Sequence, residues 1–228
     1  MVLKSLLHLF YPELCVACGG GLVSNETYIC LDCQLNLPKT GFHKYSGNPA
    51  DQIFWGRFPL QRASSFLYFE KAAGVQKILH HIKYLGGKKI AKMIGELYGD
   101  ELKSIGEYDN IDVIIPVPLH KSKLISRGYN QSEWFALGLS ETIKVPVQSN
   151  NLIRIYKSET QTRKTRYKRW QNVSDIFAVA HPDLLKNKHI LLVDDVVTTG
   201  ATLEACAQQL LALNCGIKIS IATIAFAS

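Results

Sequence analysis

The C-terminal part of the chain contains two long apolar runs with one amphipathic pattern between them, and this alternation constrains the fold more than any other feature. The runs are "HILLVDDVV" (189–197) and "IKISIATIAF" (217–226), and the segment between them is "ATLEACAQQLLAL" (201–213). The apolar runs predict buried strands, and the spacing of apolar residues between them predicts a helix. A strand, a helix and a second strand in this order predict a βαβ unit, from which parallel sheets are built.

The same alternation begins upstream, near residue 63. Further strand patterns are "ASSFLYFE" (63–70), "IDVIIPVPL" (111–119) and "VPVQSNNLIRIY" (145–156). Further helical patterns are "KAAGVQKILHHIKYL" (71–85), "KKIAKMIGELYGDELKSI" (88–105) and "GYNQSEWFALGLSETI" (128–143). Strands that alternate with helices indicate an α/β fold with a parallel sheet, and we assign residues 63–228 to one such domain. Ligands of these sheets bind outside the carboxyl ends of the strands, where we expect the functional site.

Residues 1–62 do not follow this alternation, and we assign them to a separate N-terminal unit. The unit opens with a short helical pattern. It ends in the stretch 38–62, which is rich in proline and glycine and has weak periodicity. Such a composition predicts an extended connector, and we expect its aromatic residues Phe54, Trp55 and Phe58 to pack against the rest of the protein.

Four cysteines lie in the middle of this N-terminal unit. Cys15, Cys18, Cys30 and Cys33 form two C-x2-C pairs that are separated by eleven residues. Two such pairs in a cytosolic chain predict one tetrahedral Zn²⁺ rather than disulfides. Four thiolate ligands leave no open coordination position, so the predicted role of the zinc is structural and not catalytic. The alternative is a set of reduced or redox-active thiols without a metal.

The charge of the chain points to anionic partners. The net charge is +7 at pH 7, and seven basic residues stand against one acidic residue, Glu159, between Arg154 and Arg169. This excess favours phosphates or nucleic acid as ligands. No apolar run reaches the roughly 20 residues that a membrane-spanning helix needs. The N-terminus also lacks the pattern of a signal peptide, so we expect a cytoplasmic protein with no integral membrane segment.

The stretch "ILLVDDVVTTGAT" (190–202) combines paired acids with a hydroxyl-rich turn. Asp194 and Asp195 follow a buried strand, and the turn and first helical residues are Thr198, Thr199, Gly200, Ala201 and Thr202. A turn that leads into a helix presents unpaired N–H groups to a phosphate. Ionised carboxylates accept hydrogen bonds only, and a ribose diol offers two donors. The stretch therefore predicts a binding site for a ribose 5-phosphate.

Two other interpretations of this stretch remain. An acidic pair after an apolar strand also holds Mg²⁺ in response-regulator receivers, but there it lies near the start of the domain, whereas only 34 residues follow Asp194 here. The second alternative is that a threonine caps the helix and the acids make buried hydrogen bonds. Adjacent carboxylates at a strand end are costly without a ligand or strong partners, which argues against it.

The stretch 190–202 resembles the phosphoribosyl pyrophosphate (PRPP) signature of type I phosphoribosyltransferases. The chain as a whole resembles the ComF family, also called GntX-like, of competence-associated proteins with a phosphoribosyltransferase fold. This resemblance rests on the cysteine module and on "IKYLGG" (82–87), "PVPLH" (116–120), "RGYNQSE" (127–133), Gln161, Arg169, Asn172, Val173 and Phe177. It implies a parallel-sheet type I phosphoribosyltransferase domain preceded by a small zinc-binding module.

The resemblance also implies a pyrophosphate site. "PVPLH" corresponds to the pyrophosphate loop of the fold, which would place Pro116, Val117 and Pro118 at the ligand. Arg127 would offer a guanidinium fork to phosphate oxygens, and Lys83, before a Gly-Gly break, is a further candidate. The alternatives are that the two prolines only end a strand, that "RGYNQ" begins a surface helix, and that Lys83 only complements a helix dipole.

Residues 158–175 correspond to the flexible catalytic loop of these enzymes. By this resemblance Arg163 and Arg169 act in catalysis together with Asp194 and Asp195. The loop is cationic and interleaved with aromatic residues, so it would close over a pyrophosphate or stack bases of a single strand. A solvated run of charge is the third interpretation.

Three functional hypotheses follow. The first is a ComF-like protein that binds PRPP with Mg²⁺ and single-stranded DNA and acts in DNA uptake during natural transformation. The alternative is an active phosphoribosyltransferase of nucleotide metabolism that transfers ribose 5-phosphate from PRPP to an unknown acceptor. A weaker one is a PRPP or nucleotide sensor that docks a helicase-like DNA-translocation factor through its zinc module.

Overall fold

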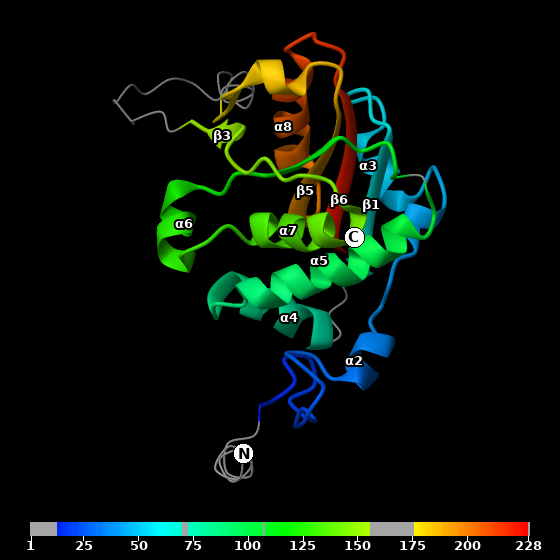
Figure 1. Cartoon of the computed structure of the whole chain (residues 1–228), viewed down its shortest axis with the longest axis vertical. Helices are drawn as coiled ribbons and strands as arrows, with labels where there is room; N and C mark the ends of the chain where they lie inside the picture. The colour runs from blue at the N-terminus through cyan, green and yellow to red at the C-terminus, as the bar shows by residue number, and fades with distance from the viewer. Residues whose placement is uncertain (1–12, 70–72, 107, 156–175, 228) are drawn as a thin grey trace.

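A four-stranded parallel sheet forms the centre of the protein in the computed structural model, which describes residues 13–69, 73–106, 108–155 and 176–227. The strands are β1 (Arg62–Tyr68), β2 (Val113–Pro116), β5 (His189–Val197) and β6 (Lys218–Phe226). They lie in the order β1-β6-β5-β2, and each neighbouring pair is parallel. The α/β fold with a parallel sheet that the sequence predicts is therefore confirmed (Figure 1).

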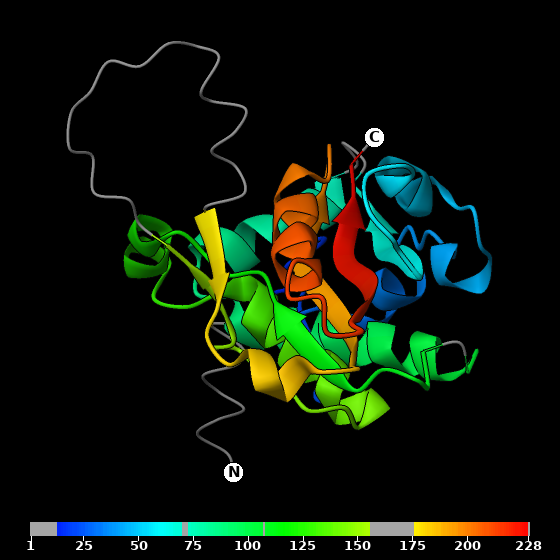
Figure 2. The ribbon, with the colours of Figure 1, turned by 90° about the horizontal axis from the view of Figure 1, so that it is seen from above.

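Helices cover both faces of the sheet. One face packs against α4 (Ala73–Tyr84), α5 (Lys88–Lys103) and α7 (Gln131–Ile143). The other face packs against α3 (Pro49–Phe54) and α8 (Ala201–Leu211), as the view along the sheet in Figure 2 shows. Successive side chains of a strand point to opposite faces, so Ile114 enters the first core while Val113 and Ile115 enter the second. This is why β2 and residues 190–193 of β5 are apolar without alternation.

Glycines bring α5 and α7 into unusually close contact. A Cβ atom added at Gly138 would lie 2.0 Å from the Lys92 carbonyl oxygen, and one added at Gly95 would lie 2.3 Å from the Phe135 carbonyl oxygen. Only residues without a side chain allow the two backbones to approach this closely. The contact fixes α7 against the sheet, and the N-terminus of α7 reaches the end of β5.

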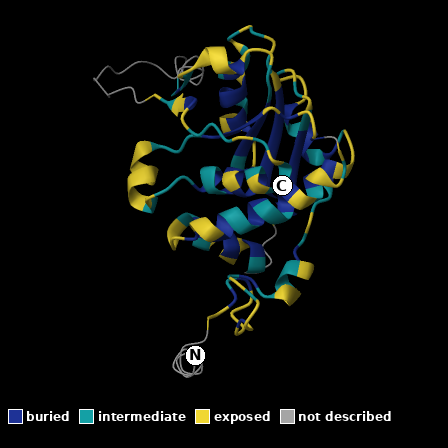
Figure 3. Ribbon diagram, viewed as in Figure 1, coloured by how far each residue is buried: buried dark blue, intermediate teal, exposed yellow. Residues whose placement is uncertain are grey.

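Smaller elements lie at the margin of the sheet. They are α2 (Leu31–Leu35), η1 (Phe42–Lys44), α6 (Lys121–Arg127), β3 (Leu152–Arg154), β4 (Phe177–Val179) and η4 (Pro182–Leu185). The predicted strand over 145–156 is only partly correct. Val147 forms a parallel bridge with Ile114, but β3 pairs separately with β4 in an antiparallel hairpin. The α6 helix, which the strand and helix patterns did not predict, is exposed along most of its length (Figure 3).

The stretch 38–62 is not an extended connector. It contains η1 and α3, and the side chains of Phe42 and Phe54 are fully buried in the second core. The Asn48 side chain caps α3 and donates to the carbonyl oxygen of Ala63 in β1, which fastens the segment to the sheet. Phe54 and Phe58 pack as predicted, but the prediction for Trp55 is wrong, because 64% of it is exposed.

The cysteine module lies against the far side of α4 (Figure 1). Its buried residues Ala17 and Ile29 belong to the same apolar cluster as Val75 and Ile78 of α4. Because the two regions share this core, the domain boundary at residue 62 stays a prediction. Within the described ranges, no helix has both the length and the apolar character that crossing a bilayer requires.

Candidate functional site

The candidate site lies where β5 ends and α8 begins. Gly200 stands between the two elements in the left-handed conformation, with φ of +74°, and no side chain among the described residues caps the N-terminus of α8. A pocket at this turn is lined by Asp194 and residues 196–203. The first N–H groups of a helix have no partner within the helix. The turn therefore offers donors and the positive end of the helix dipole to an anion, as the sequence predicts for Thr198–Thr202.

Residues from the N-terminal segment support this turn, and the sequence did not reveal them. A Cβ atom at Gly200 would lie 2.6 Å from Cε1 of Phe54 and 2.7 Å from Cγ2 of Ile53, so α3 packs directly against the turn. Arg57 Nη1 donates to the Thr199 carbonyl oxygen at 2.8 Å and to Glu204 Oε2 at 3.1 Å. Arg57 thus ties the turn to the first residues of α8.

The two acids of the site have different neighbours. Asp194 Oδ1 accepts a hydrogen bond from Ser132 Oγ at 2.8 Å and another from the Asp195 N–H at 2.9 Å. Asp195 Oδ2 accepts from Gln131 Nε2 at 2.9 Å and lies 3.1 Å from Lys83 Nζ. Lys83, a predicted ligand-binding residue, is therefore brought to the site, but it pairs with a carboxylate.

Electrostatics at the acid pair act on the pKa of Asp194 in two opposite directions. Burial raises the pKa of Asp194, and the neighbouring charge of Asp195 raises it further. The Asp195 N–H, the Ser132 hydroxyl and the Lys83 ammonium act in the opposite direction, because they stabilise the ionised form. A pair of adjacent carboxylates persists here because α4 and α7 supply donors to it.

Four consecutive side chains before and within α7 connect the elements of the site. The Tyr129 hydroxyl donates to the Ile82 carbonyl oxygen, which precedes Lys83. Asn130 Nδ2 donates to the Val117 carbonyl oxygen at 3.0 Å, and the next two residues bind the acids. The motif "RGYNQSE" was visible in the sequence, but nothing in it indicated that Gln131 and Ser132 bind Asp195 and Asp194.

The segment 116–118 offers no free backbone donor. Pro116 and Pro118 have no N–H group, and the Val117 N–H donates to the Val193 carbonyl oxygen at 2.9 Å. Val117 is also buried. Any pyrophosphate contact from this loop would therefore come from residues that follow Pro118.

The remaining predicted site residues have mixed outcomes. The Arg127 guanidinium lies over the ring of Tyr84, with its Cζ atom 5.3 Å from the ring centroid, so it is stacked in this structure. Thr198, Thr199, Ala201 and Thr202 all line the pocket. Arg163 and Arg169, with the rest of the predicted catalytic loop, lie outside the described residues.

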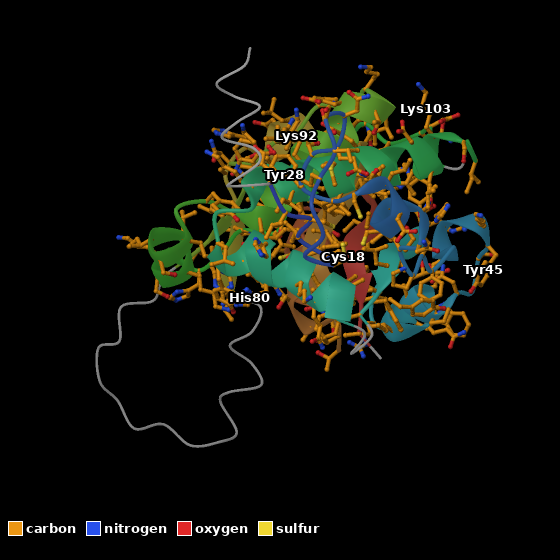
Figure 4. All side chains as sticks on the ribbon, turned by 90° about the horizontal axis from the view of Figure 1, so that it is seen from below. Cys18, Tyr28, Tyr45, His80, Lys92 and Lys103 are labelled. Carbon is orange, nitrogen blue, oxygen red and sulfur yellow. The ribbon has the colours of Figure 1, made fainter. Side chains whose placement is uncertain are left out.

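The four cysteines of the N-terminal module converge. Their Sγ atoms all lie within 4.8 Å of one another, and the Cys18 and Cys30 atoms are 3.8 Å apart. Tetrahedral zinc with Zn–S bonds of about 2.3 Å requires S···S separations of roughly 3.8 Å, so this donor set fits one metal ion. The Gly20 N–H points to Cys18 Sγ and the Cys30 N–H to Cys15 Sγ, each at 3.3 Å. Figure 4 looks onto this side of the molecule, where Cys18 and Tyr28 are labelled.

Comparisons with known proteins agree with this architecture. The family model for the phosphoribosyl transferase domain matches residues 87–228. Competence protein F of Haemophilus influenzae is 25% identical over 225 residues, with 88% of this chain and 92% of the relative covered. DNA utilization protein YhgH of Escherichia coli K12 is 27% identical over 215 residues, with 88% and 91% covered. Competence protein ComFC of Bacillus subtilis is 27% identical over 150 residues, with 66% and 59% covered.

Two solved structures that align with parts of the chain are enzymes. Glutamine phosphoribosylpyrophosphate amidotransferase from B. subtilis aligns with a TM-score of 0.43 and 18% identity, over 62% of this chain and 30% of that one. Adenine phosphoribosyltransferase from Leishmania tarentolae aligns with a TM-score of 0.37 and 13% identity, over 83% and 94%.

Proposed function

Because the chain belongs to the phosphoribosyl transferase domain family and is ComF-like, we propose that it binds PRPP with Mg²⁺ and acts in DNA uptake. The observation that carries the PRPP proposal is the turn between β5 and α8, with its uncapped helix N-terminus and Asp194 on the wall of one pocket. A sugar phosphate matches this arrangement, because the phosphate needs N–H donors and the sugar hydroxyls need acceptors.

The pocket residues suggest how the ligand lies. The 5-phosphate would bind the N–H groups of residues 200–203, with the threonine hydroxyls as additional donors. The sugar hydroxyls would donate to Asp194, whose Oδ2 atom has no hydrogen-bond partner among the described residues. Mg²⁺ prefers oxygen ligands and would accompany the pyrophosphate group of PRPP, where it neutralises charge. Oxygen atoms of Asp194 and of the threonines fit that preference.

The proposal of a role in DNA uptake has separate support. Two relatives are named as competence proteins and one as a DNA utilization protein. The alignments with competence protein F and with DNA utilization protein YhgH each cover 88% of this chain. The basic stretch between Arg154 and Arg169 supplies charge for a nucleic-acid backbone. We propose single-stranded DNA as the second ligand and a helicase-like translocation factor as the partner protein.

Structural Zn²⁺ in the four-cysteine module is a further part of this proposal. The four thiol groups match the geometry and the donor preference of zinc, and all four coordination positions would be filled by protein. We infer that the ion holds the knuckles together and keeps the module packed on α4.

The test is thermal unfolding with and without PRPP and Mg²⁺. A ligand that binds only the folded state raises the unfolding temperature, and the rise should grow with PRPP concentration. Absence of any rise at millimolar PRPP would overturn the proposal. Pyrophosphate release from PRPP, measured with and without single-stranded DNA and candidate bases, separates a binding protein from the alternative of an active phosphoribosyltransferase, which family membership also favours.

A further inference from the structure

The two acids of the site are held by one continuous chain of contacts. Lys83 Nζ lies 3.1 Å from Asp195 Oδ2, and Gln131 Nε2 donates to the same oxygen at 2.9 Å. Ser132, next to Gln131 in the first turn of α7, donates to Asp194 Oδ1 at 2.8 Å. The Asp195–Gln131 hydrogen bond therefore also sets the position of Ser132 against Asp194.

The acids differ in what they face. Asp194 lines the pocket at the β5–α8 turn, whereas Asp195 is not among the described residues that line it. Asp195 is 8% exposed and is directed to α4 and α7 by its contacts. The Gln131 amide donates to it even though its own Oε1 atom is buried without a hydrogen-bond partner among the described residues. An amide that gives up one bond to donate to a carboxylate indicates that the Asp195 contact dominates its orientation.

We propose that Asp194 alone receives the sugar hydroxyls, and that Asp195, Lys83 and Gln131 are positioning residues that hold Asp194 through Ser132. This inference rests on the proposed binding of PRPP, since it assigns different roles to the residues of that site. It differs from the symmetrical expectation in which both acids contact the diol.

The charge balance gives a reason for the division. A buried carboxylate without a partner is strongly disfavoured, and two adjacent ones beside an anion site would repel the ligand's phosphate. Lys83 cancels the charge of Asp195, so the pocket presents a single carboxylate next to the helix N-terminus. Removing Lys83 alone leaves an uncompensated charge, whereas removing Lys83 and Asp195 together does not.

Calorimetric titration of four ligands tests the division of roles. The probes are PRPP with Mg²⁺, ribose 5-phosphate, 2-deoxyribose 5-phosphate and inorganic phosphate. In the wild-type protein ribose 5-phosphate should bind more tightly than its deoxy analogue. Asp194→Asn should weaken ribose 5-phosphate about 10- to 100-fold and remove the preference over the deoxy sugar, because the lost hydrogen bonds involve a charged acceptor.

A double-mutant cycle tests the positioning role. Lys83→Met and Asp195→Asn should each weaken ribose 5-phosphate about tenfold, and the combined variant should be no weaker than the weaker single variant. The combined variant should also keep the preference for ribose over deoxyribose, because Asp194 remains. Lys77→Met, on the exposed face of the same helix, is the matched control and should bind all four ligands as the wild type does.

Rescue variants keep the test independent of misfolding. Lys83→Arg and Ser132→Thr retain the charge and the hydroxyl, and both should bind close to wild type. Inorganic phosphate should bind every variant, because the turn is unchanged. If the losses of ribose 5-phosphate affinity in the two single variants multiply in the combined variant, and the preference for ribose is lost there, the inference is wrong but the proposed function stands. A wild-type protein that binds neither PRPP nor ribose 5-phosphate would instead overturn the proposed function, and the inference with it.

Discussion

The cysteine module and the acid site both depend on converging side chains, but they draw those side chains from very different lengths of chain. The four thiols come from residues 15–33 and lie within 4.8 Å of one another. The acid site joins Lys83, Gln131 and Ser132 to Asp194 and Asp195, which lie 62 and 64 positions from their α7 partners. A site built locally can be inferred from spacing, whereas a site assembled by the fold cannot.

The largest expected effect concerns the cysteine module. Cys30→Ser should release the zinc and unfold the module, because structural zinc in small modules contributes apparent binding free energies of about 10–16 kcal/mol. The α/β domain should keep its fold, because its second core contains no residue of the module. Metal analysis and hydrogen exchange measure both outcomes, and Cys215→Ser, outside the cluster, is the control. Freshly purified wild-type protein without zinc would contradict the prediction.

The fold of the α/β domain was predictable because its strands are buried on both faces. Residues 190–193 of β5 are buried on both faces and are therefore all apolar, so the sequence alone identifies the strand. The stretch 38–62 misled the prediction for the opposite reason. Its prolines and glycines indicated a connector, but Phe42 and Phe54 are buried only because the fold brings them to the sheet.

The candidate site, like the fold, could be predicted only in part. The turn at Thr198–Thr202 follows its strand directly, so local sequence sufficed. Arg57 and Ile53 reach the turn from a distant segment, and their residue types carry no signal of that contact. Buried pairing of Asp195 with Lys83 was likewise invisible, since a lysine at a helix end has an ordinary explanation.

The next effect concerns the ligand response of the acid site. Asp194→Asn combined with Asp195→Asn should abolish stabilisation by PRPP, because the amide at position 194 accepts hydrogen bonds from the sugar less strongly than a carboxylate does. The lost stabilisation amounts to about 2.7 kcal/mol at a PRPP concentration of 100 times Kd. Thermal unfolding measures it. Asp112→Asn serves as a charge-matched control, because Asp112 lies at the N-terminal end of β5, where it accepts from the His189 N–H, and the site lies at the other end. An unchanged shift in the double variant would show that the acids are structural only.

A smaller effect tests the contact between the N-terminal segment and the turn. Gly200→Ala should destabilise the protein by about 2 kcal/mol, because alanine disfavours the left-handed conformation and its Cβ would meet Ile53 and Phe54. Gly86→Ala is the matched control. Gly86 has nearly the same φ, +72°, but nothing lies within 4 Å of its added Cβ. Equal losses of stability in urea unfolding would mean that α3 does not constrain the turn.

The smallest expected effect concerns the basic stretch between Arg154 and Arg169. A DNA site there would be formed by residues close together in the sequence, as the cysteine module is. If this stretch holds single-stranded DNA, its cations replace condensed counterions, and affinity should fall with salt by about 0.7 log units per decade for each phosphate contact. Arg166→Ala with Arg169→Ala should flatten that slope by about 1–1.5 units if both arginines contact phosphate.

Trp170→Ala should weaken DNA binding with little change of the salt slope, because stacking on a base releases no counterions. Asp194→Asn should leave DNA affinity unchanged if the DNA stays outside the pocket, since nucleotides within a DNA strand have no free sugar hydroxyl to donate. If the arginine and tryptophan substitutions leave DNA binding at low salt unchanged, the DNA proposal is wrong, and the proposals of the sugar-phosphate site and of the zinc site remain.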